Sequence, residues 1–265
     1  MTGRAAGWRW ALRPLAHPLA VALCLAATPG AAETGTSGNG EMEAARDAFL
    51  ESHGGGRIFS VTGDRIELRT GEGQPALFWD VEAAYGGDIE KIVFSAEGEY
   101  AFQPESLEEL EIQALYRRAV SPFFDLELGL RHDFEPDPSR NFAVLGMVGT
   151  LPLIIEGLAS IFISDDGDVS ARLEGEYDLL ITQRLILQPR VELNLAVQEV
   201  AELGLGQGLT DVEGGLRLRY ELRRRLAPYL GVTFSRDIGE TANFTRAEDE
   251  DVGAISAVAG VRFWF

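Results

Sequence analysis

Two strictly alternating segments at residues 170–195 constrain the fold more than any other feature of this sequence. In SARLEGEYDL the odd positions are apolar or small, whereas the even positions carry Arg172, Glu174, Glu176 and Asp178. After Thr182 the alternation resumes, with leucine and valine opposite Arg190 and Glu192. Side chains of a β-strand point to opposite faces with a period of two. The region therefore predicts two strands joined by a tight turn, each with one apolar and one charged face.

The same alternation continues along the chain from Arg57, where no segment has the periodicity of a helix. We expect twelve strands: 57–69, 76–86, 89–101, 106–119, 122–134, 141–150, 152–164, 168–181, 183–197, 210–222, 226–237 and 253–265. The first of them has an alternative interpretation, because VTGD inside 57–69 could instead form a small hairpin. The number of strands is even, and each is long enough to cross a bilayer at a tilt.

The connections between these strands sort into two kinds that alternate. TGEGQP and GETANFTRAEDED are examples of the polar and mostly long kind, whereas LP, TQ and RRR are tight turns. This sorting is typical of outer-membrane barrels, which have short periplasmic turns and longer extracellular loops. The terminal GVRFWF is typical of the last strand of such a barrel. We therefore predict an all-β fold, a 12-stranded antiparallel transmembrane β-barrel with an acidic lumen, in the bacterial outer membrane.

A soluble sandwich or a lipocalin-like barrel is the alternative fold. It requires a hydrophobic interior, and the charged faces of these strands would place too many unpaired charges there. In a membrane barrel the same pattern is accommodated, because Leu173 and Leu193 would contact lipid while Arg172 and Glu192 would line the lumen.

The segment before the barrel has the features of an export signal. Arg4, Arg9 and Arg13 precede the short apolar run LAVALCLAA, and small residues follow, so we predict a signal peptide over 1–32. A lipoprotein signal at Cys24 is disfavoured, because Leu23 occupies a position that requires a small residue. Residues 33–56 are polar and glycine-rich, and we predict a flexible periplasmic segment there. The barrel would then span 57–265.

The chain is strongly acidic, with a formal net charge of −19. Nucleic acid is therefore excluded as a partner, and a cation is favoured. The predicted lumen faces carry almost twice as many acids as bases. Arg–Glu pairs between neighbouring strands could fill and stiffen a narrow barrel, and surplus carboxylates could also steer cations along it.

No catalytic constellation accompanies these charges, so we expect no enzymatic activity. Beyond the signal peptide the sequence has two histidines, His53 and His132, and it lacks the GxSxG and HExxH motifs. DDGD at 165–168 resembles part of a calcium loop, but it lacks the spacing and terminal Glu of an EF-hand. We interpret it as a turn. An outer-membrane hydrolase is therefore the least favoured function.

Several long runs resemble the copper resistance protein B family. They are LYRRAVSPFFDLELGLRHDF, RLEGEYDLLITQRLILQPRVELNL, GLRLRYELRRRLAPYLGV and GVRFWF. The resemblance covers 57–265 and implies an outer-membrane barrel that acts in copper resistance and homeostasis by binding or passing copper ions. It also implies three partners: membrane lipid, copper ions and a periplasmic multicopper oxidase. A small general channel or structural barrel without metal specificity is the alternative.

The sequence departs from the family in its N-terminal segment. Many members carry a segment rich in Met and His there, whereas 33–56 contains only Met42 and His53. A copper site must therefore use the barrel, and the candidate ligands are Glu174, Glu176, Asp178, His132 and Met147. From an antiparallel register about the 181–183 turn, we expect Asp178 to lie near Arg184 and Glu174 near Arg190 or Gln188. Glu176 would then have the least obvious partner.

Overall fold

The computed structural model describes residues 56–71, 75–103, 105–136, 138–223, 225–249 and 251–265. The predicted signal peptide and, apart from Gly56, the predicted segment 33–56 lie outside the described residues. Among the described residues, no helix has the length and apolarity that a membrane-spanning helix needs.

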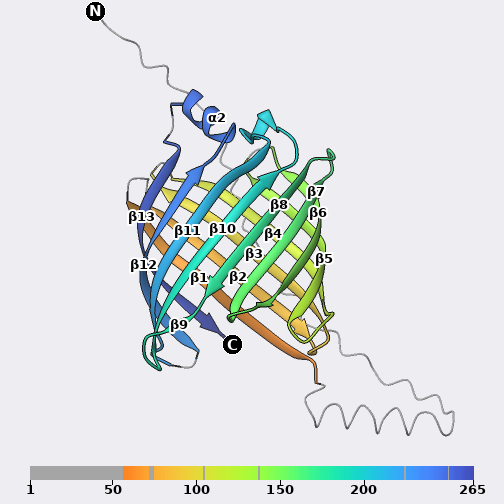
Figure 1. Cartoon of the computed structure of the whole chain (residues 1–265), viewed down its shortest axis with the longest axis vertical. Coiled ribbons are helices and arrows are strands. Elements are labelled where there is room, and N and C mark those ends of the chain that lie inside the picture. The colour runs from red at the N-terminus through yellow and green to blue at the C-terminus, as the bar shows by residue number, and fades with distance from the viewer. Residues whose placement is uncertain (1–55, 72–74, 104, 137, 224, 250) are drawn as a thin grey trace, which may run out of the picture. The chain divides into compact units, whose positions relative to one another are not determined.

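The described residues form one closed antiparallel barrel (Figure 1). Its strands are β1 (Ile58–Gly71), β2 (Ala76–Gly86), β3 (Glu90–Phe102), β4 (Glu105–Ala119), β5 (Phe124–Glu135), β6 (Arg140–Leu151), β7 (Ile155–Ser164), β8 (Val169–Tyr177), β9 (Leu179–Leu180), β10 (Leu185–Ala196), β11 (Gly208–Tyr220), β12 (Leu226–Asp237) and β13 (Gly253–Trp264). Each strand pairs with the next one around the wall, and β13 pairs with β1 to close it. The short β9 continues the wall position of β8, since both pair with β10. The prediction of a 12-stranded barrel is therefore confirmed.

The two faces of the strands have opposite polarity, as the alternation predicts. Leu128, Leu130 and Leu230 on the outer face are 59%, 68% and 67% exposed, whereas Glu111 and Glu127 on the inner face are 2% and 1% exposed. A water-soluble protein has the reverse arrangement. The apolar faces thus point outward, and the charged faces line the lumen.

The first strand is one continuous strand and not the hairpin that VTGD could have formed. Gly63 lies at an irregularity of the register with both neighbours, β2 and β13. A β-bulge inserts an extra residue without ending the pairing, which explains how the strand passes through a turn-like sequence. A Cβ on Gly63 would lie 2.5 Å from the Phe263 ring, so glycine also allows β13 to approach closely at the barrel seam.

The connections gather at two ends, which we call the turn end and the loop end. The turn end holds 87–89, 120–123, 152–154, 181–184 and the described residues of 221–225, together with the C-terminus; the loop end holds the described residues of the other connections (Figure 1). At the loop end, 197–207 and 238–252 are longer than the turns. Apart from 165–168, the other loop-end connections are shorter than predicted, because the strands that flank them extend further toward this end. DDGD at 165–168 is a turn, as expected, closed by a hydrogen bond from the Ser164 N–H to the Asp168 carbonyl.

The expectation of no helix beyond Arg57 is wrong in the two long loops. The 3-10 helix η1 (Ala201–Leu203) lies in one of them, and α2 (Thr241–Ala247) lies in the other. The Thr241 hydroxyl accepts a hydrogen bond from the Gly206 N–H at 2.9 Å, which joins the loops. Seven residues are too few to give a readable amphipathic period, so local sequence could not identify α2.

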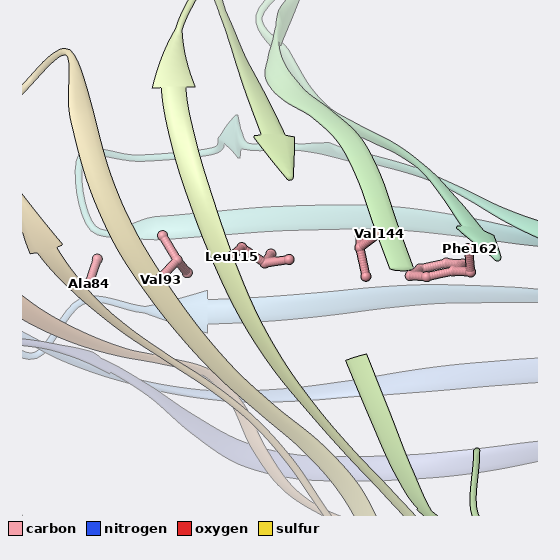
Figure 2. Close-up of a cluster of buried hydrophobic side chains, with 5 residues drawn as sticks. All are labelled: Ala84, Val93, Leu115, Val144 and Phe162. Atoms are coloured by element: carbon pink, nitrogen blue, oxygen red, sulfur yellow. The ribbon is translucent and has the colours of Figure 1, made fainter. Parts of the chain in front are cut away.

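The lumen wall also contains an apolar row that strict alternation of charge did not predict. Ala84, Val93, Leu115, Val144 and Phe162 are buried in one cluster (Figure 2). They follow each other in register from β2 to β7, with Gly129 between Leu115 and Val144. The inner wall is therefore not lined by charged side chains alone.

Candidate metal-binding lumen

Carboxylates on β2–β5 form a continuous row on the inner wall. Asp80 lies directly opposite Glu97, Glu97 opposite Glu111, and Glu111 opposite Asp133. Like charges directly opposite each other destabilise a sheet. Four acids in one register line therefore require cationic groups between or above them.

A second row of carboxylates lies on β8, β10 and β11. Glu174 is opposite Glu192, and Glu192 is opposite Glu213. Both rows belong to the same barrel, but four to five wall positions separate β3 and β4 from β8. The lumen thus has acidic rows on two separate parts of its wall.

Arginines occupy the space between these rows. Arg65 contacts Asp80 at 3.0 Å and Glu97 at 3.1 Å, and Arg131 contacts Glu111 at 2.7 Å. On the other wall, Arg190 contacts Glu174 at 2.5 Å and Glu192 at 2.9 Å. Such charge-assisted hydrogen bonds compensate part of the repulsion within each row.

Aromatic rings hold the guanidinium groups in place. Arg65 and Arg69 lie 4.6 and 3.9 Å from the centre of the Phe78 ring. Arg131 and Arg172 lie 4.7 and 5.7 Å from the centre of the Phe162 ring. Cation–π contacts at these distances favour one orientation of an arginine side chain. The arginines are therefore fixed by rings as well as by carboxylates.

The charged residues of β1 also face the lumen, which the sequence did not predict. Glu67 accepts hydrogen bonds from Arg217 at 2.9 and 3.0 Å and from the Tyr229 hydroxyl at 2.9 Å. Arg65 and Arg69 stand on either side of it on the same face. The signal was present in RIELR, where Arg65, Glu67 and Arg69 alternate with Ile66 and Leu68. The turn-like VTGD sequence hid this alternation.

A cavity of about 430 Å³ extends from the arginines toward the turn end. Nine acidic residues and six arginines line it, so the cavity has a surplus of negative charge. Glu156 and Glu176 lie directly opposite each other in its wall. Within the described part of the chain, Glu156 forms no ion pair within 4 Å. Its carboxylate is therefore available to a cation.

The three predicted carboxylates of β8 and its continuation all face the lumen, but their partners differ from our expectations. Glu174 contacts Arg190, as predicted. The prediction for Asp178 is wrong, because it contacts Arg219 on β11 at 2.6 Å instead of Arg184. The prediction for Glu176 is also wrong: it accepts a hydrogen bond from Gln188, and Arg262 lies at 3.6 Å.

The other two predicted ligands lie on the outer face of the barrel. Met147 on β6 is 45% exposed there. His132 stacks edge-on with Phe134, and its Nδ1 lies 2.8 Å from the Asn141 side-chain oxygen. The Asn141 amide also donates to Asp165 in the β7–β8 connection, and this hydrogen bond lowers the pKa of the Asp165 carboxyl. The barrel wall separates both residues from the lumen carboxylates, so the five predicted ligands do not form one site.

The donor atoms of the lumen define what it could bind. The residues lining the cavity offer carboxylate, hydroxyl and amide oxygens, without imidazole or thioether. In the described ranges no group of three or more His, Cys, Asp and Glu side chains has the geometry of a metal site. The lumen therefore suits a cation held loosely by oxygen atoms better than one enclosed in a rigid site.

Comparison with known proteins identifies the family of this chain. A family model described as copper resistance protein B precursor matches residues 57–265, which is the barrel with all of its described strands. The chain belongs to the copper resistance protein B family. The matched residues, 57–265, coincide with the barrel boundaries that the strand pattern predicts.

Two relatives support the family assignment, and one solved structure shares the fold. The copper resistance protein B homolog of Pseudomonas syringae pv. tomato is 40% identical over 229 residues, which cover 84% of this chain and 77% of the relative. Copper resistance protein B of Escherichia coli is 40% identical over 202 residues, covering 76% and 68%. The NanC porin structure superposes with a TM-score of 0.50 at 11% identity, covering 78% of this chain and 99% of the porin. That likeness concerns the fold alone.

Proposed function

We propose that this protein acts in copper resistance as an outer-membrane barrel whose lumen binds or passes copper ions. The observation that carries the proposal is the acidic cavity inside a barrel of the copper resistance protein B family. Surplus carboxylates attract cations into the lumen. Copper is the cargo in this proposal, and no catalytic step is required.

The outer face supports the membrane location. Apolar side chains cover it, and a closed barrel leaves no unpaired strand edge, which a lipid environment requires. Tyr85, Tyr116 and Tyr220 are 50%, 43% and 42% exposed and lie near the turn-end termini of their strands. Tyrosines at this level are typical of the aromatic belt at a membrane–water interface. Lipid is thus the proposed partner of this face.

The proposed oxidation state of the copper ion follows from the oxygen donor atoms that line the cavity. Thioether and thiolate ligands favour Cu(I), whereas oxygen donors suit harder cations, including Cu(II). We therefore propose that Cu(II) occupies the lumen cavity, with Glu156, Glu176 and Glu174 as its carboxylate contacts. His132 and Met147 would meet copper only from outside the barrel. Delivery to or from a periplasmic multicopper oxidase remains a prediction from the family resemblance.

A pair of isosteric substitutions that removes two carboxylate charges tests this role. Glu156→Gln combined with Glu176→Gln should lower the copper tolerance of a complemented deletion strain and weaken Cu(II) binding by the purified barrel. Tolerance of zinc and silver should change less. The control is Glu90→Gln, which removes one carboxylate charge from the outer face, where Glu90 pairs with Arg118 at 3.5 Å. Folding is monitored by heat-modifiable migration in gels. Normal tolerance and binding in the folded double variant would refute the proposed cavity site.

A further inference from the structure

Arg172 reaches from one wall of the barrel to another. It lies on β8, yet its guanidinium contacts Glu97 on β3 at 3.5 Å and Glu111 on β4 at 3.2 Å. It also contacts Glu192 on the neighbouring β10 at 3.4 Å. Since β8 is not adjacent to β3 or β4 in the sheet, these ion pairs cross the lumen.

Arg65 makes a second connection of this kind and shares one carboxylate with Arg172. From β1 it contacts Glu97, and its Nη1 lies 3.9 Å from Glu213 on β11. Glu97 therefore accepts both guanidinium groups, one through each oxygen. The result is a continuous bar of charged side chains, Arg172–Glu97–Arg65, which we call the crossbar.

The cavity ends at the crossbar. Arg65, Glu97 and Arg172 belong to its lining, as do residues nearer the turn end such as Glu82 and Glu156. The next lumen-facing residues toward the loop end on β1 and β3, Glu67 and Glu99, are not part of it. Arg65 and Arg172 are themselves only 6% and 9% exposed. The crossbar thus separates the cavity from the loop-end half of the lumen.

We propose that the crossbar is a gate, and that Arg65 and Arg172 determine what can pass through the barrel. Guanidinium groups already satisfy the carboxylates of the crossbar, so a cation must displace one of them to proceed. A divalent ion replaces the charge of two such contacts, whereas a monovalent ion cannot. Without such an ion the barrel is closed. This inference rests on the proposed function, because it assumes that a cation enters the lumen.

Conductance of purified barrels in planar lipid bilayers, in potassium chloride without copper, tests the gate. The wild-type protein should give no resolved openings. Arg65→Gln combined with Arg172→Gln should give stable openings with a reversal potential that favours potassium over chloride, because the freed carboxylates remain. Arg117→Gln is the matched control: Arg117 is also in the lumen, but it pairs within one wall, with Glu82 and Glu127 at 2.7 and 2.5 Å. It should remain closed.

A second variant protects the test against failure to fold. Glu97→Gln removes the charge and one of the two acceptor oxygens that the arginines share, without removing either arginine, so it should also give openings, with weaker selectivity for potassium. An open wild-type barrel, or closed folded barrels of both the arginine double variant and Glu97→Gln, would overturn the gate. Because the assay contains no copper, its failure would leave the tolerance experiment on Glu156 and Glu176 unaffected.

Discussion

Glu67 has none of its side chain exposed, and its partner Arg217 has only 3%. Both charges are held away from water by the barrel wall, with Arg69 at 3.0 Å and the Tyr229 hydroxyl as further partners. A buried pair of this kind contributes little compared with an apolar pair, but a single charge left behind is costly. The stability of the barrel at this position therefore depends on whether Glu67 and Arg217 are both present.

Removal of one partner should therefore be worse than removal of both. We expect Glu67→Gln to lower the free energy of unfolding by about 3–5 kcal/mol, since it leaves Arg217 buried without its charge partner. Glu67→Gln combined with Arg217→Met should recover much of that loss. Urea unfolding in lipid vesicles, followed by tryptophan fluorescence, measures both. If the double variant is less stable than the wild-type protein by the sum of the losses of Glu67→Gln and Arg217→Met measured singly, the pair is not energetically coupled.

The partners of single residues were the part of the site that the sequence could not predict. The alternation placed Glu174, Glu176 and Asp178 on the lumen face correctly. Their contacts, however, depend on which walls the closed barrel brings together. Asp178 leaves the ladder between β8 and β9, and it contacts Arg219 two wall positions away instead of the adjacent Arg184. Arg262 is distant in sequence from Glu176 and approaches it only because the barrel closes.

At the scale of the strand, the outer and inner faces of β12 make opposite demands on a side chain. Val232 on the outer face is 51% exposed near the middle of the strand. Ser235 lies on the lumen face, directly opposite Glu213. The same charged substituent should therefore have different effects at these two positions, three residues apart.

Val232→Arg should destabilise the barrel by ~2–4 kcal/mol, the cost of an arginine on the lipid face near the bilayer midplane. Ser235→Arg adds the same charge but can pair with Glu213, so it should fold nearly as well as the wild-type protein. Refolding yields into vesicles and urea unfolding provide the comparison. Equal losses in the two variants would show that the outer face of β12 is not in contact with lipid.

Strands were more predictable than the elements between them. A period of two repeated over ten or more residues is a strong signal, and it located every long strand within a few residues. The helix α2 was missed because its seven residues lie in a polar loop and its packing depends on Gly206 from a different loop. The inward apolar row was missed because Val93, Val144 and Phe162 belong to strands whose two faces both contain apolar residues.

At the scale of the whole molecule, the two ends of the barrel differ in charge. Exposed acids at the loop end include Glu202, Glu240, Glu248, Asp249 and Asp251, whereas exposed arginines at the turn end include Arg184, Arg223 and Arg225. An acidic rim raises the local concentration of cations before they enter the lumen. The two sides of the proposed membrane therefore meet different electrostatic surfaces, and the orientation of the barrel decides which side collects cations.

Outer-membrane barrels place short turns in the periplasm and longer loops outside the cell, so the loop end should face the medium. Single cysteines can test this, because the only cysteine of the sequence, Cys24, lies in the predicted signal peptide. Ala247→Cys, at the exposed end of α2, should react with a membrane-impermeant maleimide added to whole cells. Gln183→Cys, in an exposed turn, should react only after the outer membrane is permeabilised. The unsubstituted protein is the control for background labelling. Labelling of Gln183→Cys but not Ala247→Cys in intact cells would invert the orientation and place the acidic rim in the periplasm, where it would collect cations from inside the cell envelope.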